Sequence, residues 1–295
     1  MTIQLFKGFG YFFYMAIFIA SAIGGYFLLR KQTNNVKKRV ILSILFFALI
    51  LHFMKLLFPP YADDPNAVRK ITPENICALS TLIFPFIFLS KNKVLKDYMF
   101  YIGILSGTLA VLIPIESLEK DAYIFAFDTI RFYLCHIIIT VAPFLMVATG
   151  LHRLDYHRVY KVPLIFMVVL AIIMINEIIL MEIGLVPLRN TDLLDPEGYR
   201  NFSMIFGLRD TFGQMGQLLT ALTPNFLMEI PYGPYAGEAK YWPLVWLILP
   251  SFILIGGLSF LMSLFWEWNH FKMDLGKLKN YCIRTFSKKI VNKGG

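Results

Sequence analysis

The chain has 295 residues, of which 57% are hydrophobic and only 16% are charged, and its net charge is +9. Soluble globular chains carry about 25% charged residues, so this chain lacks the polar surface that a soluble fold needs. The composition excludes a disordered chain, a nucleic-acid-binding domain with a basic surface and most soluble enzymes. Apolar runs recur that are long enough to cross the roughly 30 Å hydrocarbon core of a bilayer. The sequence therefore predicts a multi-pass protein of the cell membrane, with membrane lipids and not nucleic acid as partners.

The apolar runs predict an all-α fold of seven transmembrane helices. In chain order we expect these helices at 9–29, 40–58, 75–90, 98–115, 132–150, 162–183 and 243–266. The first run is too long for the apolar part of a signal peptide and has no clear cleavage site, so we expect it to be retained. The seven helices form a membrane domain over residues 1–270. The basic tail at 271–295 is expected to lie against anionic cytoplasmic lipid.

The segments between the predicted helices sort by charge. The basic set, with 18 Lys and Arg against 4 Asp and Glu, comprises 30–39, 91–97, 151–161 and 267–295. The other set, with 9 against 13, comprises 1–8, 59–74, 116–131 and 187–242. Because basic connections stay in the cytoplasm, this alternation predicts an outer N-terminus and an inner C-terminus. The long outer loop at 187–242 holds an amphipathic stretch at 202–219 and a Pro/Gly/Tyr-rich stretch at 231–237, as in a lid or binding element.

Some small residues in the predicted helices are interpreted as packing residues. Gly103 and Gly107 are four residues apart, a spacing that lets two helices approach closely. Cys135 adjoins a histidine in sequence, but neighbouring helix positions point about 100° apart, which favours packing for this thiol. A Cys77–Cys135 disulfide remains open for an oxidising compartment.

Polar side chains inside the predicted helices gather at similar depths below the outer surface. At 1.5 Å per residue they lie about 3–11 Å below the outer helix ends. These residues are His52, Lys55, Cys77, His136, Asn176 and Glu177. Asp128 and Arg131, on the turn above His136, would cap this layer. Ionisable groups in hydrocarbon are costly and usually paired or functional, and the inner half shows no comparable layer, so we expect the site in the outer half.

A cysteine near a histidine suits nucleophilic catalysis, because imidazole accepts the thiol proton and the thiolate attacks an acyl carbon. In this hypothesis Cys77 is the nucleophile, His136 the base, Lys55 and His52 electrostatic helpers, and Glu177 the residue that orients a histidine. Two alternatives remain open. The same residues could form a buried ion-pair network that only stabilises the fold, or Glu177, Lys55 and His52 could serve a transporter or solute-binding protein.

The remaining polar residues complete the hypothesis. Asn176, Asp128 and Arg131 are the candidate substrate-binding residues. His152 and His157 are five apart, which gives no clean metal-binding pair on a helix, so a solvated loop is expected there. The sequence contains no phosphate-binding loop, dinucleotide fingerprint, HExxH or CxxC motif, and we expect neither a cofactor nor a metal ion. A third class, a receptor or scaffold, would instead use the 187–242 loop to bind a partner.

Two segments resemble a known family, the YwaF-like bacterial integral membrane proteins. They are the run Ile76-Cys77-Ala78-Leu79-Ser80 through Gly103, Gly107 and Ile113-Pro114, and the run Arg131-Phe132-Tyr133-Leu134-Cys135-His136 continuing to Pro143. This family is similar to animal seven-helix membrane proteins linked to acyl transfer between phospholipids, with a cysteine and a histidine proposed as catalytic. The resemblance implies Cys77 as nucleophile and His136 as base of a lipid acyltransferase or acyl hydrolase. Asn75 and Ala78 stand where members often have a histidine and an acidic residue.

Overall fold

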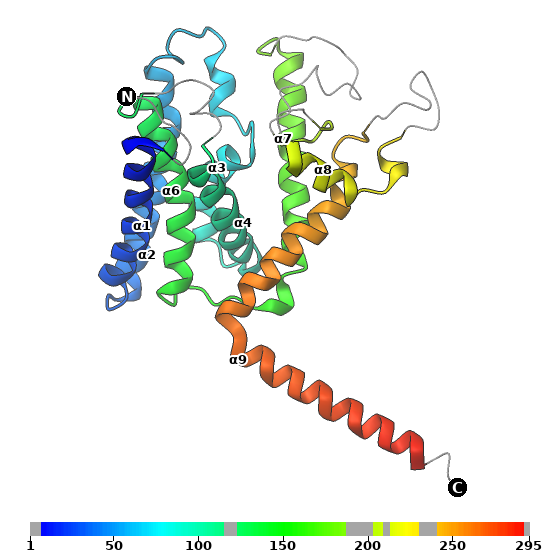
Figure 1. The fold of residues 1–295 in the computed structure, drawn as a ribbon. Coiled ribbons are helices and arrows are strands. Elements are labelled where there is room, and N and C mark those ends of the chain that lie inside the picture. The colour runs from blue at the N-terminus through cyan, green and yellow to red at the C-terminus, as the bar shows by residue number, and fades with distance from the viewer. Residues whose placement is uncertain (1–6, 115–122, 187–202, 209–212, 230–240, 292–295) are drawn as a thin grey trace.

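The structure is a computed structural model that describes residues 7–114, 123–186, 203–208, 213–229 and 241–291 (Figure 1). All regular elements in these ranges are helices, which confirms the predicted all-α fold. The Pro/Gly/Tyr-rich stretch at 231–237 lies outside the described residues, as does part of the amphipathic stretch at 202–219.

Each predicted transmembrane run coincides with a helix. The α-helices are α1 (Gly8–Leu29), α2 (Asn34–Met54), α3 (Ile76–Leu89), α4 (Lys93–Leu112), α6 (Phe127–Ala148), α7 (Lys161–Glu182), α8 (Gly213–Ala221) and α9 (Ile248–Val291). The 3-10 turns are η1 (Lys55–Leu57), η2 (Ala67–Ile71), η3 (Tyr156–Arg158), η6 (Asn225–Leu227) and η7 (Val245–Leu247). The helix α8 belongs to the long connection between α7 and α9.

Six of the described helices are long and apolar enough to cross a bilayer: α1, α2 with η1, α4, α6, α7 and α9 with η7. The helix at the remaining predicted position, α3, has 14 residues. At 1.5 Å per residue it is about 21 Å long, shorter than the roughly 30 Å hydrocarbon core. The chain is thus a multi-pass helical membrane protein.

Polar capping residues set the start of three helices. The side chain of Thr33 accepts from the amide of Val36 at the start of α2. Asn75 accepts from Ala78 at 2.8 Å before α3, and Asn92 caps α4 in the same way. The predicted starts of α2 at 40 and of α4 at 98 are therefore wrong by six and five residues. Hydropathy detects only the apolar part of a helix, whereas a capping residue marks where the helix begins.

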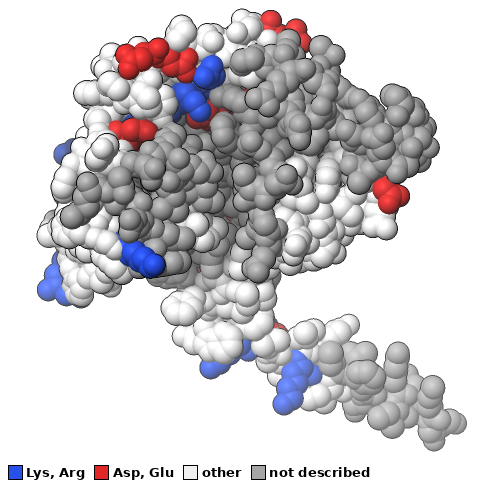
Figure 2. Space-filling view, turned by 45° about the horizontal axis from the view of Figure 1, so that its top comes forward, with Lys and Arg blue, Asp and Glu red and all other residues white. Residues whose placement is uncertain are grey.

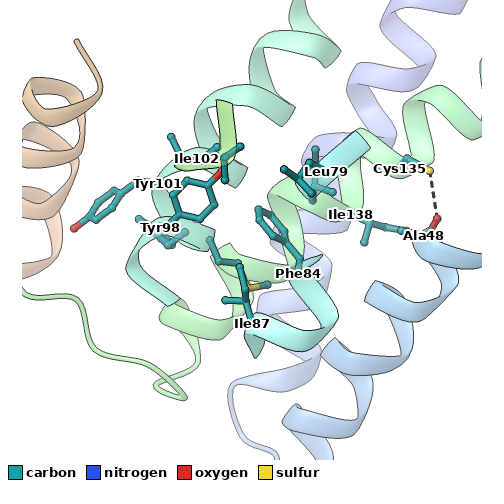
Figure 3. Packing of buried hydrophobic residues seen from close by; sticks show 14 of the residues in the cluster. Ala48, Leu79, Phe84, Ile87, Tyr98, Tyr101, Ile102, Cys135 and Ile138 are labelled. Atoms are coloured by element: carbon teal, nitrogen blue, oxygen red, sulfur yellow. Dashed lines mark hydrogen bonds between the residues drawn. The ribbon is translucent and has the colours of Figure 1, made fainter. Parts of the chain in front are cut away.

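The helix α6 lies at the centre of the bundle. It packs against α1, α2, α3 and α4, whereas α7 packs against α4 on one side and α9 on the other (Figure 1). Figure 3 shows side chains from α3, α4 and α6 interlocked, with Phe84, Tyr98 and Ile138 among them. Cys135 of α6 points instead toward α2, where its Sγ lies 3.7 Å from the carbonyl oxygen of Ala48.

Gly103 and Gly107 bring α4 against α6, as their spacing predicts. A Cβ atom on Gly107 would lie 2.1 Å from Oγ1 of Thr140 and 2.8 Å from the carbonyl oxygen of His136. A Cβ atom on Gly103 would lie 2.4 Å from the carbonyl oxygen of Ile139. Thr140 Oγ1 lies 3.3 Å from the carbonyl oxygen of Gly103, within hydrogen-bond distance across the contact. Only glycine fits at these two positions, because at each one a backbone carbonyl oxygen of α6 lies less than 3.0 Å from the Cβ position.

We predict that Gly107→Ala lowers the free energy of unfolding by about 2–3 kcal/mol, because α4 must move away from α6 to admit the methyl group. Gly24→Ala is the matched control, since a Cβ atom on Gly24 would meet nothing within 4 Å. Unfolding of both variants in mixed micelles measures the difference. Equal stability of the two variants would contradict the close approach.

The end of the bundle that carries the basic connections, here called the inner end, holds a buried ionic cluster. Asp97 of α4 is only 1% exposed. It accepts from Nε2 of His152 at 2.7 Å and from Nε and Nη2 of Arg158 at 2.6 and 3.1 Å. This carboxylate raises the pKa of Arg158 above its usual value through the hydrogen bond. Nearby, Nε of Arg153 donates to Glu267 of α9 at 2.9 Å.

Two expectations are therefore wrong at this end. The inner half has its own polar layer, and His152 is a buried partner of Asp97, not a residue of a solvated loop. Only His157 of that histidine pair is exposed. The charges of this layer are separated by 55 and 61 positions in sequence, so no local spacing reveals them.

We predict that Asp97→Asn lowers the free energy of unfolding by about 3 kcal/mol, because it removes the buried carboxylate that faces His152 and Arg158 and leaves Arg158 with the half-buried Asp155 alone. Asp63→Asn, on an exposed side chain at the other end of the bundle, should change stability by less than about 0.5 kcal/mol. Thermal unfolding of both variants in the same detergent provides the comparison. A loss of equal size in the two variants would show that the cluster contributes nothing specific.

The described parts of the long connection fold onto the start of α9. The Trp246 indole is fully buried, and its Nε1 lies 3.0 Å from the carbonyl oxygen of Met204. Thr223 hydroxyl lies 3.3 Å from the carbonyl oxygen of Trp246, which joins the end of α8 to the same point. These contacts anchor the described parts of the connection to the bundle.

The helix α9 changes direction at Glu267, whose backbone leaves helical geometry with φ −118° and ψ 20°. The predicted last transmembrane run ends one residue before this break. Beyond it the helix runs away from the bundle (Figure 1). Figure 2 shows Lys side chains on this tail and Asp and Glu side chains mainly at the opposite end of the molecule.

Candidate functional site

At the outer end of the bundle, which carries the segment 58–75, three predicted residues meet around one aromatic ring. Nε of Arg131 donates to Oδ1 of Asp128 at 3.0 Å, and the hydroxyl of Tyr61 donates to Oδ2 at 3.3 Å. Nζ of Lys55 and Cζ of Arg131 each lie 5.7 Å from the centroid of the Tyr61 ring. Lys55 is only 4% exposed. Two cations and one carboxylate therefore surround Tyr61.

His52 of α2 lies one turn below Lys55 and is 3% exposed. Its Nε2 lies 3.1 Å from the carbonyl oxygen of Ile71, the last residue of η2, so this nitrogen carries the proton in the bond. His52 thus ties the segment between α2 and α3 to the bundle.

The same segment is bound to α7. Nδ2 of Asn176 donates to Oγ1 of Thr72 at 3.1 Å. Nη1 of Arg69 donates to the carbonyl oxygen of Leu185 at 3.2 Å, and Arg69 also pairs with Asp64 at 2.8 Å. Residues 58–75 therefore cross the outer end of the bundle and join α2, α6 and α7.

We predict an energetic coupling of about 1 kcal/mol between Asn176 and Thr72. A double-mutant cycle with Asn176→Ala and Thr72→Val measures it through the unfolding free energies of the four proteins. A coupling of zero would show that this bond does not hold the segment to α7. Ser90→Ala is the control for this cycle. The Ser90 hydroxyl donates to the carbonyl oxygen of Ile87 in its own turn, so we expect no coupling between Ser90→Ala and Asn176→Ala.

Cys77 occupies the first turn of α3, two residues after the capping residue Asn75. Its side chain is partly buried, and its carbonyl oxygen accepts from Oγ1 of Thr81 at 2.9 Å. The N-terminus of a helix carries partial positive charge, which favours the thiolate form of a cysteine. This position suits a nucleophile. Both Cys77 and Cys135 are free thiols, so the disulfide left open by the sequence is not formed.

His136 lies on α6 one turn below Phe132. Its Nδ1 lies 2.7 Å from the carbonyl oxygen of Phe132, and the two rings are in contact with centroids 4.3 Å apart. Because a carbonyl oxygen only accepts, Nδ1 carries the proton and Nε2 carries the lone pair. The ring is thus held in the tautomer that a general base needs.

The remaining predicted residue, Glu177, is buried on α7 at 4% exposure. The structure thus brings Lys55, Asp128 and Arg131 together directly, and it joins His52 and Asn176 through the segment 58–75. Cys77 and His136 lie on α3 and α6, two helices that pack on each other.

Sequence reasoning missed Tyr61 and Thr72, which connect the predicted residues to one another. Neither lies inside an apolar run, so depth in a helix gave no signal for them. Tyr61 is the aromatic residue that follows Pro59-Pro60 in a polar connection. An aromatic ring within reach of two predicted cations is the signal that was available.

These features define a class: a multi-pass helical membrane protein with a polar layer beneath its outer end. The sequence profile of the TMEM164 family matches residues 6–203, two thirds of the chain. The chain belongs to the TMEM164 family. The match covers every candidate residue of the outer end and stops before α8 and α9. No curated protein and no solved structure matches the chain at a significant level.

Proposed function

We propose that this protein transfers or hydrolyses the acyl chains of membrane phospholipids through a thioester on Cys77, with His136 as general base. The observation that carries the proposal is the placement of Cys77 in the first turn of α3, against the helix that presents His136. The resemblance to seven-helix acyltransferases supports the same assignment. Membership of a membrane protein family is consistent with a lipid substrate.

The heights of the two residues in the bundle support the pairing. Gly103 of α4 shows which residues of α3 and α6 lie at the same height in the bundle. A Cβ atom on Gly103 would lie 3.1 Å from the Phe84 ring of α3 and 2.4 Å from the Ile139 carbonyl oxygen of α6. From that level Cys77 is seven residues nearer the outer end, about 10 Å along its helix. His136 is three residues nearer the outer end, about 4–5 Å. The backbones of the two residues thus differ in height by about one helical turn.

Both side chains lean toward the outer end, because α3 and α6 both begin there, but the imidazole of His136 reaches farther along its helix than the short side chain of Cys77. The bond from Nδ1 to the Phe132 carbonyl holds the ring over the preceding turn, nearer the level of Cys77. Nε2 of His136 is then the base for the Cys77 thiol.

The reaction has two balanced halves. Nε2 of His136 takes the proton of the Cys77 thiol, and the thiolate attacks the ester carbonyl carbon of a phospholipid. The tetrahedral oxyanion collapses, the ester C–O bond breaks, and the leaving lysophospholipid takes the proton from His136. In the second half a lysophospholipid hydroxyl or water gives its proton to Nε2 and attacks the thioester. The C–S bond breaks and the thiol recovers its proton.

The other outer residues serve the lipid headgroup and the charge of the reaction. Lys55 and Arg131, both beside Tyr61, are cations of the kind that bind a phosphate. Asp128 holds Arg131, and Asn176 holds the segment 58–75 over the site. We assign oxyanion stabilisation to Lys55 and the orientation of a histidine to Glu177.

The proposed topology has seven crossings in the cell membrane, with α3 as the seventh, the N-terminus outside and the C-terminus inside. The charge alternation of the connections supports it, since the basic set lies at the inner end of the bundle. In this topology Cys77 and His136 meet phospholipid of the outer leaflet.

Intact mass spectrometry after incubation with phospholipid vesicles tests the mechanism. We expect an acyl adduct on the wild-type protein that hydroxylamine removes and that is absent from Cys77→Ala. His136→Ala should slow adduct formation by about 10²–10⁴-fold, the usual contribution of a general base. Cys135→Ala is the matched control, because that thiol packs against the Ala48 carbonyl and should leave the adduct unchanged. Full lipid-remodelling activity of Cys77→Ala would overturn the proposal.

A transporter or solute-binding protein is the second candidate function. The ionic cluster of the inner end favours it, because polar side chains occur at both ends of the bundle. In that case the wild-type protein and Cys77→Ala should both take up solute into proteoliposomes, and Glu177→Gln should abolish that uptake. An acyl adduct that is absent from Cys77→Ala, together with no solute uptake by the wild-type protein, would exclude this candidate.

A further inference from the structure

Two histidines and an aspartate from distant parts of the chain converge at the inner end. His157 belongs to η3, between α6 and α7, whereas His270 and Asp274 lie one turn apart on α9, beyond its break. One ligand atom from each of the three residues lies within 4.8 Å of the other two. Nε2 of His157 is 3.6 Å from Oδ2 of Asp274. The centroids of the two imidazole rings are 5.9 Å apart.

Each histidine also contacts a carboxylate that orients its ring. Nδ1 of His157 lies 3.0 Å from Oδ1 of Asp155, which leaves Nε2 directed toward Asp274. Nδ1 of His270 lies 3.2 Å from Oε2 of Glu267, a buried side chain that Arg153 holds from the other side. A carboxylate behind a histidine is the usual outer partner of a metal-binding imidazole, because it fixes the ring and makes it more basic.

Asp274 is held in place by two further side chains. The hydroxyl of Tyr156 donates to Oδ2 at 2.5 Å, and Nζ of Lys277 lies 2.9 Å from Oδ1. A ligating carboxylate commonly accepts such additional hydrogen bonds. The three side chains are half-buried or exposed, so an ion from solution can reach them.

We propose that His157, His270 and Asp274 form a binding site for a divalent transition-metal ion of the zinc type. Two imidazole nitrogens and one carboxylate oxygen are ligands that zinc accepts, with a fourth position left for water. Ligand atoms around a tetrahedral zinc are about 3.3 Å apart. The 3.6 Å between Nε2 of His157 and Oδ2 of Asp274 is close to this spacing. The other ligand atoms lie within 4.8 Å of one another, so binding brings each pair closer by at most about 1.5 Å.

The ion would join two elements that the chain connects only through more than 100 residues. His157 comes from the loop after α6, the central helix, and the other two ligands come from the basic tail. Bound metal would fix the tail helix to this loop. The site lies at the opposite end of the bundle from Cys77, so it is independent of the proposed acyl chemistry.

Zinc titration of the full-length protein in detergent, with any affinity tag removed, tests the proposal. Calorimetry and elemental analysis should give one Zn²⁺ per chain. His157→Ala, His270→Ala and Asp274→Asn should each weaken binding by at least about tenfold. Zn²⁺ should also slow cleavage by trypsin after Lys272 and Lys277 in the wild-type protein.

Two controls separate a built site from general binding by histidines. His136→Ala and Asp63→Asn remove one residue of each ligand type elsewhere and should leave zinc affinity unchanged. His157→Ala should in turn leave acyl-adduct formation unchanged, so the two proposals fail separately. Wild-type protein that binds no zinc, or a His157→Ala/His270→Ala variant that binds it as tightly as wild type, would overturn this one.

Discussion

The close approach of α4 to α6 is the contact on which the bundle depends. Lipid tails are as apolar as the side chains they replace, so helices in a membrane associate through close packing and hydrogen bonds. Gly103 and Gly107 place the α4 backbone directly against that of α6, and Thr140 bonds across the contact. α3 packs against both of these helices. The relative height of Cys77 and His136 follows from this packing.

The two ends of the bundle use polar groups differently. At the inner end, Asp97 accepts hydrogen bonds from a histidine and an arginine of the loop after α6, and these bonds hold that loop to α4. At the outer end, Arg131 pairs with Asp128, and Arg131 and Lys55 both lie near the Tyr61 ring. The inner set thus joins a loop to a helix, whereas the outer set gathers two cations around one aromatic ring.

The starts of the six described helices that are long enough to cross a bilayer could be predicted from the sequence to within about six residues, because hydrocarbon requires long apolar runs. The packing role of Gly103 and Gly107 was also predictable, since four-residue spacing places both on one face. Contacts between distant segments were not. His52 meets Ile71, and Asp97 meets Arg158, through turns whose direction no periodicity records. For the same reason depth identified Lys55, and the spacing to Asp128 identified Arg131, but neither signal identified Tyr61, the ring that both cations approach.

The break in α9 at Glu267 has a consequence for how the protein fits its bilayer. An unbroken helix of 44 residues would be about 66 Å long, twice the thickness of the hydrocarbon core. The part from Ile248 to the break has 19 residues, about 28 Å, which matches that core with little tilt. Because Arg153 holds Glu267, the loop after α6 sets the hydrophobic length of the last helix. A thicker membrane would therefore place its strain on this break, where Arg153 and His270 both pair with Glu267.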